Sequence, residues 1–505
     1  AYEKRGVAVT VPQWNEATCV QCNQCAYVCP HATIRPFALT EEEAAAAPAS
    51  TKLVDIKAGK GKGVYKYTMA VSPLDCMGCG VCIGVCPTKS LTMVPQADEA
   101  AQQDAFDYCV AKVSEKADMI STNSVKDSQF KKPLLEFSGS CAGCAETSYA
   151  RLITQVCGDR MYISNATGCS SIWGGPAATS PYTVDANGHG PAWANSLFED
   201  NAEHGLGLYL GQKTVRENLI KRIAEVAGSD KASAELKAAF DEFMATKNNT
   251  KANDAPAKAL IAELEKAAAA GCTESAEILK SKEFIAKKSV WIFGGDGWAY
   301  DIGFGGLDHV LASGEDVNVM VFDTEMYSNT GGQASKASNI GEVCQFAAAG
   351  KEISKKSLSE IAMTYGYIYV AQIALGANMN QAVKAIAEAE AYPGPSLIIG
   401  YAPCELHGVK GGMTNCQNEM KKAVEAGYWN LFTFNPANKA QGKNPFTLTS
   451  KAVDAEKYQA LLANETRYSR LTRAFPERAK ALFARNEQVA NDRYEHLTRL
   501  VELYK

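Results

Sequence analysis

Two short cysteine runs are the most chemically distinctive feature of this 505-residue sequence. Each run has four cysteines separated by two, two and three residues and is followed by Pro: Cys19, Cys22, Cys25 and Cys29, then Cys76, Cys79, Cys82 and Cys86. Four thiolates so close together can each bind a different iron of a cubane cluster. Paired zinc sites would instead need two cysteine pairs with a longer gap between them. The runs therefore predict two [4Fe-4S] clusters, which pass single electrons and have no open position for a substrate.

The spacing also predicts how the two runs share their ligands, and it resembles the bacterial ferredoxin pattern. Three cysteines two residues apart wrap a tight loop around one cluster, while the fourth, on the helix that follows, points to the other cluster. We therefore expect each run to contribute its fourth cysteine to the opposite cluster. The predicted sets are Cys19, Cys22, Cys25 and Cys86, and Cys76, Cys79, Cys82 and Cys29.

The composition limits the classes of protein to which this chain could belong. The chain is 46% hydrophobic and 21% charged with a formal charge of −5, which is ordinary for a soluble protein and lacks the basic excess of nucleic-acid binders. It has no apolar run long enough to span a bilayer, and residues 1–6 lack the apolar core of a signal peptide. We expect a cytoplasmic location, where metal ligation is a better explanation than disulfides for 17 cysteines.

The length predicts two or three domains. Residues 1–110 hold the cysteine runs, separated by an apparent insertion at 41–63. From 111 to 450 strands and helices alternate, which predicts a doubly wound, mostly parallel α/β sheet interrupted by a helical insertion at about 213–288. Residues 451–505 predict a charged C-terminal helical extension, packed on the surface or on a partner. The predicted strands are Met161–Ser164, Val290–Phe293, Val317–Phe322, Ile368–Val370 and Leu397–Gly400.

Two polar, glycine-rich loops follow neighbouring predicted strands. Gly294, Gly295, Asp296 and Gly297 follow the first strand, and the ten residues 323–332 follow the second. Parallel strands deliver such loops to the same edge of the sheet. Hard oxygen ligands beside glycine-rich backbone suit Mg²⁺ bridging a diphosphate.

The stretch from Gly295 to Asn329 resembles the Gly-Asp-Gly motif of thiamine diphosphate (TPP) enzymes. The resemblance implies that Asp296 and Thr324 offer side-chain oxygens to Mg²⁺, that Met326 offers its carbonyl, and that Asn329 reaches the diphosphate or the substrate. Thr324 stands where most such enzymes carry Asn, a mild change because both are neutral oxygen ligands. Gly295 and Gly297 belong to the same cofactor-binding loop.

Four further cysteines fall near this predicted edge. Cys141 and Cys144 precede a helix, while Cys169 and Cys404 follow predicted strands. Taken singly, each could be an inert core thiol. Together they could hold a third [4Fe-4S] cluster beside the TPP loops. The remaining cysteines, Cys109, Cys157, Cys272, Cys344 and Cys416, have no comparable context and are expected to be structural.

A two-cluster ferredoxin domain joined to a TPP module with its own cluster is similar to the C-terminal half of the pyruvate:ferredoxin oxidoreductase (pyruvate synthase) family. The resemblance implies that pyruvate, coenzyme A and oxidised ferredoxin or flavodoxin give acetyl-CoA, CO₂ and the reduced carrier. It also implies that Thr167, Gly168 and Ser170 line the diphosphate. Ile172 is either the apolar wedge that holds TPP bent or a buried core residue.

The sequence shows only the diphosphate side of a TPP site. The module that binds the aminopyrimidine ring, and the family's coenzyme A-binding segments, have no counterpart here, so we expect a separate N-terminal half as partner and a dimer of the whole unit. His189 and His407, each beside glycine, could act directly or could shape loops. Two alternatives stay open, namely an oxidoreductase for 2-oxoglutarate, 2-oxoisovalerate or indolepyruvate, and a non-catalytic electron carrier.

Overall fold

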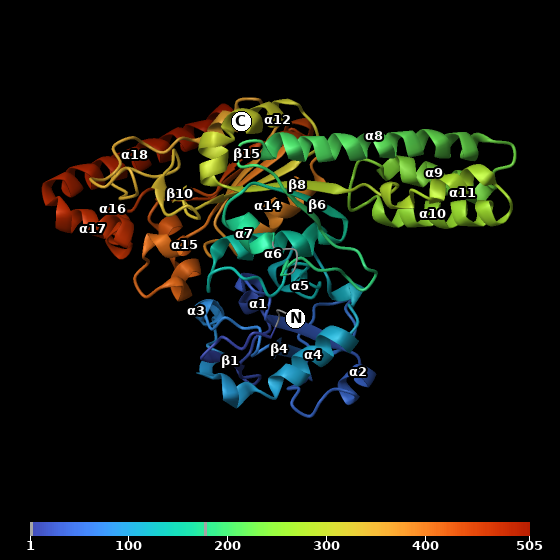
Figure 1. Ribbon diagram of the computed structural model, residues 1–505, viewed down its shortest axis with the longest axis horizontal. Helices are drawn as coiled ribbons and strands as arrows, with labels where there is room; N and C mark the ends of the chain where they lie inside the picture. The colour runs from blue at the N-terminus through green and yellow to red at the C-terminus, as the bar shows by residue number, and fades with distance from the viewer. Residues whose placement is uncertain (1–3, 176–178) are drawn as a thin grey trace.

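The computed structural model describes residues 4–175 and 179–505 and has a central α/β part, a small α+β part below it and a helical arm to one side (Figure 1). This arrangement confirms the predicted fold class. Residues 1–3 of the predicted first domain lie outside the described residues. No helix among the described residues is both long and apolar enough to cross a membrane.

The small α+β part is built from two antiparallel sheets, one of order β1-β5 and one of order β2-β4-β3. Met119 and Phe130 also pack in its core, beyond the expected boundary at residue 110. Its elements are β1 (Thr10–Trp14), α1 (Gln24–Val28), β2 (Ile34–Leu39), α2 (Glu41–Ala45), β3 (Val54–Asp55), β4 (Lys66–Val71), α3 (Val81–Val85), β5 (Leu91–Pro95), α4 (Gln102–Lys112) and α5 (Val125–Ser128).

Helices α1 and α3 repeat one local design. Each begins after a residue in the left-handed region, Asn23 with φ 60° and Gly80 with φ 72°, and each ends at the fourth cysteine of its run. The two helices pack against each other. The repeat therefore brings Cys29 and Cys86, at the two helix ends, toward the opposite cysteine run.

The expected insertion at 41–63 has regular structure of its own. Helix α2 starts at a capping box, in which Thr40 accepts from the backbone N–H of Glu43 and Glu43 accepts from that of Thr40. The segment then adds β3 to the edge of β4 and so extends the small sheet.

The central sheet has the order β15-β14-β12-β13-β9-β8-β6-β7 and is parallel from β12 to β7, with two antiparallel strands at one edge. Because both faces are covered, the central strands are continuous apolar runs and are almost entirely buried. The strands are β6 (Met161–Asn165), β7 (Ala192–Asn195), β8 (Ser289–Gly295), β9 (Asn318–Asp323), β12 (Tyr369–Ile373), β13 (Ser396–Tyr401), β14 (Phe432–Phe434) and β15 (Phe446–Leu448).

Helices cover both faces of the sheet. Helices α6 and α14 lie on the face turned toward the small part, whereas α8 and α12 cover the opposite face (Figure 1). A small hairpin of β10 (Met326–Tyr327) and β11 (Gln333–Ala334) follows β9. The helices are α6 (Ala145–Cys157), α7 (Cys169–Gly174), α12 (Phe304–Ala312), α13 (Leu358–Met363), α14 (Met379–Ala391) and α15 (Cys416–Glu425), with a π-helical turn at Gly297–Ile302.

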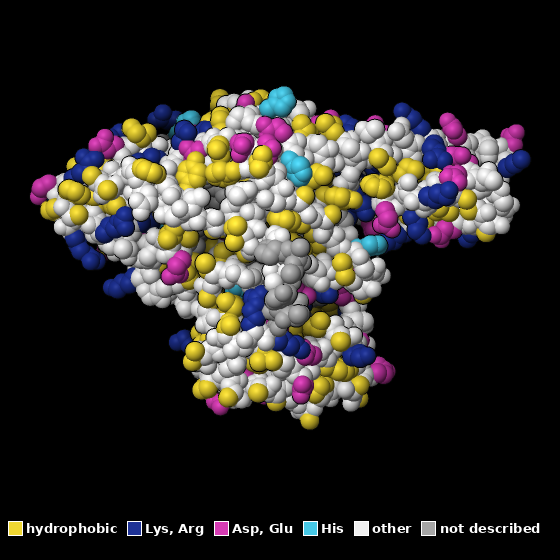
Figure 2. All heavy atoms as spheres, in the orientation of Figure 1, with side chains coloured by type: hydrophobic (Ala, Val, Ile, Leu, Met, Phe, Trp, Pro, Cys, Tyr) yellow, Lys and Arg dark blue, Asp and Glu magenta, His cyan; other side chains and the backbone are white. Residues whose placement is uncertain are grey.

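The arm consists of four helices with a core of their own. Leu219, Phe243 and Leu260 are buried in it. Helix α8 begins twelve residues before the expected insertion, at Asn201, and its first turns pack on β6 and β8. Figure 2 shows charged side chains of both signs over this arm. Its helices are α8 (Asn201–Gly228), α9 (Ala234–Thr246), α10 (Asp254–Ala269) and α11 (Thr273–Leu279).

The C-terminal tail, expected to be a helical extension packed on the surface or on a partner, is divided among three helices. It forms α16 (Ala455–Asn464), α17 (Thr466–Ala474) and α18 (Pro476–Leu503). Arg467 of α17 is only 2% exposed, since carboxylates from distant loops surround it. A charged residue in such a tail is normally solvated, and only the tertiary contacts reveal that this one is not.

Candidate functional site

The fourth cysteine of each run lies close to thiols of the other run. After burial, the charges that raise the pKa of the Cys22 thiol most are those of Cys19, from its own run, and Cys86, from the other. The pKa of the Cys79 thiol is raised first by burial and then by the charge of Cys29, from the other run. These influences support the predicted sets, Cys19, Cys22, Cys25 and Cys86, and Cys76, Cys79, Cys82 and Cys29, although the charge of Cys25 also affects Cys82.

Backbone N–H groups point at the sulfur atoms of both sets. Gln21 donates to Cys19 Sγ at 3.3 Å and Gly78 donates to Cys76 Sγ at 3.3 Å, so the two runs repeat the contact as well as the spacing. Such donors stabilise negative charge on thiolates, and hydrogen bonds to sulfur are among the factors that set cluster potentials.

The four dispersed cysteines line one cavity of about 150 Å³. Cys141 and Cys144 lie on the loop before α6, Cys169 is the first residue of α7, and Cys404 follows β13. In residues 4–175 and 179–505 no three His, Cys, Asp or Glu side chains converge as the ligands of a single ion would. The ligands of a [4Fe-4S] cluster need not converge on one point, because each thiolate binds a different iron of the cluster.

A second cavity adjoins the first along a shared wall. The residues common to both are Glu146, Cys169, Thr324 and Asn329. The second cavity is otherwise lined by the two glycine-rich loops and the β6–α7 turn, including Thr167, Gly168, Ser170, Gly295, Asp296, Gly297 and Met326. The register brings these loops together because Gly295 pairs with Phe322 and Tyr401 with Asp323 at the carboxyl ends of the strands.

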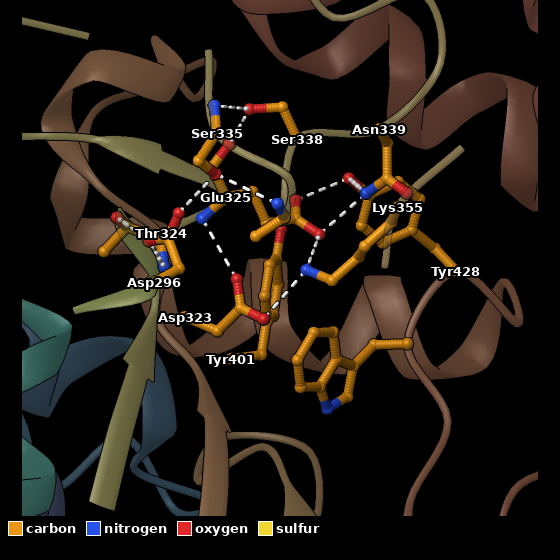
Figure 3. Close-up of polar contacts among 12 residues, drawn as sticks. Asp296, Asp323, Thr324, Glu325, Ser335, Ser338, Asn339, Lys355, Tyr401 and Tyr428 are labelled. Atoms are coloured by element: carbon orange, nitrogen blue, oxygen red, sulfur yellow. Dashed lines mark hydrogen bonds and ion pairs between the residues drawn. The ribbon is translucent and has the colours of Figure 1, made fainter. Parts of the chain in front are cut away.

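Three oxygen atoms gather at the base of the second cavity. Thr324 Oγ1 lies 2.9 Å from Asp296 Oδ1 and 3.0 Å from the carbonyl oxygen of Met326. These are the three groups that the resemblance to TPP enzymes implies as Mg²⁺ ligands. Asp296 Oδ2 accepts a hydrogen bond from Ser335 at 2.6 Å, which fixes the carboxylate, and Figure 3 shows this group of side chains.

Buried charge around the loop fits a cation. Asp296, Asp323 and Glu325 are fully buried, and Lys355 contacts the last two at 2.8 and 3.0 Å (Figure 3). Burial, and then the charge of Asp323, raises the pKa of Asp296 well above its usual range. A divalent cation bound to Asp296 would offset both effects, so the donor set suits Mg²⁺.

The glycines of the cavity leave room for a ligand. A Cβ at Gly168 would meet no atom within 4 Å and would project into open space. A Cβ at Gly297 would lie 2.5 Å from the Tyr327 ring, so this position tolerates no side chain. The residues present therefore fit a diphosphate that approaches the backbone closely.

The remaining predicted residues fall in different places. Asn329 is exposed on the shared wall of the two cavities. Ile172 lines the cysteine cavity and is 59% exposed, so it is not the buried core residue that the sequence left open. His407 is fully buried with Nε2 at 2.7 Å from the Thr324 carbonyl, which suits a loop-shaping role. His189 lies beside Glu283 and lines neither cavity.

Comparisons with known proteins agree with this geometry. Residues 18–90 match the family model for the 4Fe-4S dicluster domain, and residues 266–399 match that for the C-terminal TPP-binding domain of thiamine pyrophosphate enzymes. The chain is 50% identical over 506 aligned residues to pyruvate-flavodoxin oxidoreductase of Klebsiella pneumoniae. Over nearly its whole length the chain is therefore similar to members of the pyruvate:ferredoxin and pyruvate-flavodoxin oxidoreductase family.

Other relatives from this family agree. Pyruvate:ferredoxin oxidoreductase of Moorella thermoacetica is 50% identical, and the mitochondrial NADP⁺-dependent pyruvate dehydrogenase of Euglena gracilis is 44% identical, each over 99% of this chain. The chain spans 42% of the Klebsiella protein, 43% of the Moorella protein and 28% of the Euglena protein. A 2-oxoglutarate:ferredoxin oxidoreductase structure from Magnetococcus marinus matches over 52% of this chain and 63% of that chain with a TM-score of 0.29 and 14% identity, too weakly to inform the fold.

Sequence reasoning missed several residues around the two cavities. Glu146 is buried on the shared wall, and burial raises its pKa to about 7. Lys355 and Arg467 hold Glu325, the residue between two of the predicted Mg²⁺ ligands. Glu146 lies two residues after Cys144, which is a weak signal, but nothing in the sequence connects residue 467 with residue 325.

Proposed function

We propose that this chain forms the diphosphate-binding half of a TPP site and the electron path of a pyruvate oxidoreductase. In the proposed reaction pyruvate, coenzyme A and oxidised ferredoxin or flavodoxin give acetyl-CoA, CO₂ and the reduced carrier, and the two electrons leave singly. One observation carries the proposal: the cavity with four cysteines shares a wall with the cavity that gathers Asp296, Thr324 and Met326. A redox group beside a cofactor pocket suits oxidative decarboxylation.

The chain's residues have distinct proposed roles. Bound TPP would supply the electron sink that decarboxylation needs. Asp296, Thr324 and the Met326 carbonyl would hold Mg²⁺ on the diphosphate, while Asn329 would contact the diphosphate or the substrate. Exposed Ile172 would support the bent cofactor from the cysteine side.

The proposed electron path runs through three [4Fe-4S] clusters. The set Cys141, Cys144, Cys169 and Cys404 comes first, beside TPP. Met413 lines that cavity, and the hydroxyl of its neighbour Thr414 donates to the Cys79 carbonyl at 2.6 Å. The cluster that includes Cys79 would therefore be second, and the cluster of Cys19, Cys22, Cys25 and Cys86 would be the outer station.

The proposed activity needs a partner. We propose an N-terminal half with the pyrimidine-binding and coenzyme A-binding modules, on the same or another chain, and a dimer of the whole unit. The lengths of the relatives, of which this chain spans 42% or less in the Klebsiella and Euglena proteins, support a larger assembly. We also keep the division into units 1–110, 111–450 and 451–505 as a proposal.

Metal content and cofactor binding test the first part of the proposal. Three cubanes predict about twelve irons per chain, whereas an electron carrier with two clusters predicts about eight. Calorimetric titration with TPP and Mg²⁺, in the presence of the N-terminal half, should give binding that Asp296→Ala abolishes. Asp308→Ala, on the neighbouring helix α12, is the matched control and should bind normally. About eight irons and no TPP binding would contradict the proposal.

Substrate turnover tests the second part. The assembled enzyme should reduce ferredoxin or flavodoxin with pyruvate and coenzyme A faster than with 2-oxoglutarate, 2-oxoisovalerate or indolepyruvate. A longer oxoacid that supports turnover where pyruvate does not would move the chain to another 2-oxoacid oxidoreductase.

A further inference from the structure

Arg151 of helix α6 is a buried arginine without a carboxylate partner. It is 1% exposed. Its Nη1 donates to Gln129 Oε1 at 3.1 Å and Gln155 Oε1 at 2.7 Å, and its Nη2 donates to the carbonyl of Tyr27. Across the described residues no Asp or Glu forms an ion pair with this guanidinium.

The two other fully buried arginines are paired differently. Arg35 forms an ion pair with Glu136, and Arg467 forms ion pairs with Glu325, Glu342 and Glu465. Neutral amide and carbonyl oxygens accept hydrogen bonds from the two terminal nitrogens of Arg151, but its Nε has no partner and its charge is left uncompensated. Burying such a charge costs several kcal/mol unless an opposite charge is close.

A cysteine of the second set, Cys29, exerts the strongest attractive electrostatic influence on Arg151. Tyr27, whose carbonyl Arg151 contacts, stands two residues before Cys29, and Ser148 on the same helix donates to the Val28 carbonyl at 2.9 Å. Helices α1 and α6 are in contact. Burial lowers the pKa of Arg151 to about 10, and the charge of Cys29 is the main influence that opposes the shift. The group therefore stays positive at neutral pH.

We infer that Arg151 is the counter-charge of the second [4Fe-4S] cluster, the one bound by Cys29, Cys76, Cys79 and Cys82, and that it raises the midpoint potential of that cluster. The inference rests on the proposed cluster ligands. A cubane with four thiolates is negative in both oxidation states, and reduction adds a further negative charge. A fixed positive charge in a dry environment stabilises the reduced state more, so the cluster becomes easier to reduce.

The surroundings concentrate this effect on one cluster. The second buried guanidinium nearby, Arg35, is already neutralised by Glu136. Arg151 belongs to the helix that follows Cys144 and reaches the end of α1 at Cys29. Its contact with α1 is at Tyr27, two residues before Cys29. A higher potential at the second station would draw electrons away from the cofactor.

Redox titration of the cluster-loaded chain, followed by electron paramagnetic resonance, tests the inference. Arg151→Met removes the charge but keeps an apolar chain of similar length, and Arg151→Lys keeps the charge. We expect the potential of the second cluster to fall in the Met variant and to stay near the native value in the Lys variant. Arg160→Met is the matched control, because Arg160 is paired with Asp159 and Glu390 and should leave all potentials unchanged.

The outcomes separate the inference from the proposed function. A Cys76→Ser variant assigns the signal of the second cluster. If iron analysis finds no such cluster, the proposed function fails. If the cluster is present and its potential is the same in the native and Met proteins, or falls equally in Lys and Met, the counter-charge role is wrong. Should the Met variant not accumulate, Arg151→Gln replaces it in the same comparison with Lys.

Discussion

At the residue scale, successive side chains of the loop after β9 point in alternate directions. One faces the proposed Mg²⁺ site, and its two neighbours form ion pairs behind it. Thr324 faces Asp296, whereas Asp323 and Glu325 on either side turn to Lys355. Burial alone would raise the pKa of Glu325, but Lys355 and Arg467 overcome it and lower the pKa to about 2. Glu325 also has φ 62°, a costly conformation for a non-glycine residue. We infer that the ion pairs hold this turn in place.

Replacing Arg467 should therefore lower the stability of the fold strongly. Arg467→Met leaves Glu325, Glu342 and Glu465 buried without their cation. Removing one partner of a buried ion pair typically costs about 3–5 kcal/mol. Urea denaturation followed by circular dichroism measures the loss. Arg473→Met, at an exposed position of the same helix, should change stability by less than about 0.5 kcal/mol. Equal effects of the two substitutions would contradict the prediction.

Glu465 should make stability depend on pH. Burial raises its pKa to about 7 although Arg467 opposes the shift, and Glu325, Glu419 and His407 also face it. Between its unfolded pKa near 4.5 and about 7, the unfolded chain loses the proton that the folded chain keeps, so this group's contribution falls as pH rises.

Glu465→Gln removes that titration. The stability of the native protein relative to the Gln variant should fall by up to about 1.4 kcal/mol per pH unit in that window. Urea denaturation of both proteins at pH 5, 6, 7 and 8 measures the difference. Parallel curves over this range would show that Glu465 is already ionised beside Arg467.

At the element scale, the helical arm is mechanically separate from the cavities. Its core residues pack among α8, α9, α10 and α11, and its main contacts with the sheet are those of α8 with β6 and β8. Damage to the arm's core should therefore stay local.

Phe243→Ala tests this separation. Phe243 is fully buried in the arm, and truncating a buried phenylalanine costs about 3–5 kcal/mol. Hydrogen exchange should accelerate in α9 and α10 but not in β8 or β9, and the iron content should not change. Phe240→Ala, at a partly buried position of the same core, is the control and should accelerate exchange less. Faster exchange in the sheet strands would mean that arm and sheet unfold together.

At the scale of the whole molecule, several large apolar side chains are exposed on or beside the loops that line the two cavities. Ile172 is 59% exposed, Leu197 65%, Leu406 46% and Phe346 94%. Leu406 lies against Gly332, and Gln345, next to Phe346, donates to the Gly332 carbonyl. Exposed apolar side chains gathered at one place indicate an interaction surface. The proposed N-terminal half is the partner that the half-built TPP site requires.

Phe346→Asp should weaken that association. A carboxylate in place of the aromatic ring would have to be desolvated at the interface, so the dissociation constant of the two halves should rise at least tenfold. Analytical ultracentrifugation of the mixed halves measures it. Val64→Asp, at a 90% exposed position of the small part, is the control and should bind normally. Unchanged binding by Phe346→Asp would remove this surface from the proposed interface.

The sequence by itself determined the parts whose signals are local. The cysteine spacing predicted which residues share a set, because the tight loop and short helix are encoded within each run. The apolar runs predicted β6, β8, β9, β12 and β13 to within three residues at each end, since a parallel sheet buried on both faces needs such runs. The polar loops after those strands then indicated Asp296, Thr324 and Met326.

Tertiary structure decided everything that depends on residues distant in the chain. It brought Cys141 and Cys404 to one cavity, exposed Ile172, and buried Arg467 among carboxylates that lie more than a hundred residues away. It also left Arg151 without a carboxylate beside the end of α1. Charge compensation is set by distance in space, and a sequence gives no measure of that distance between residues far apart in the chain.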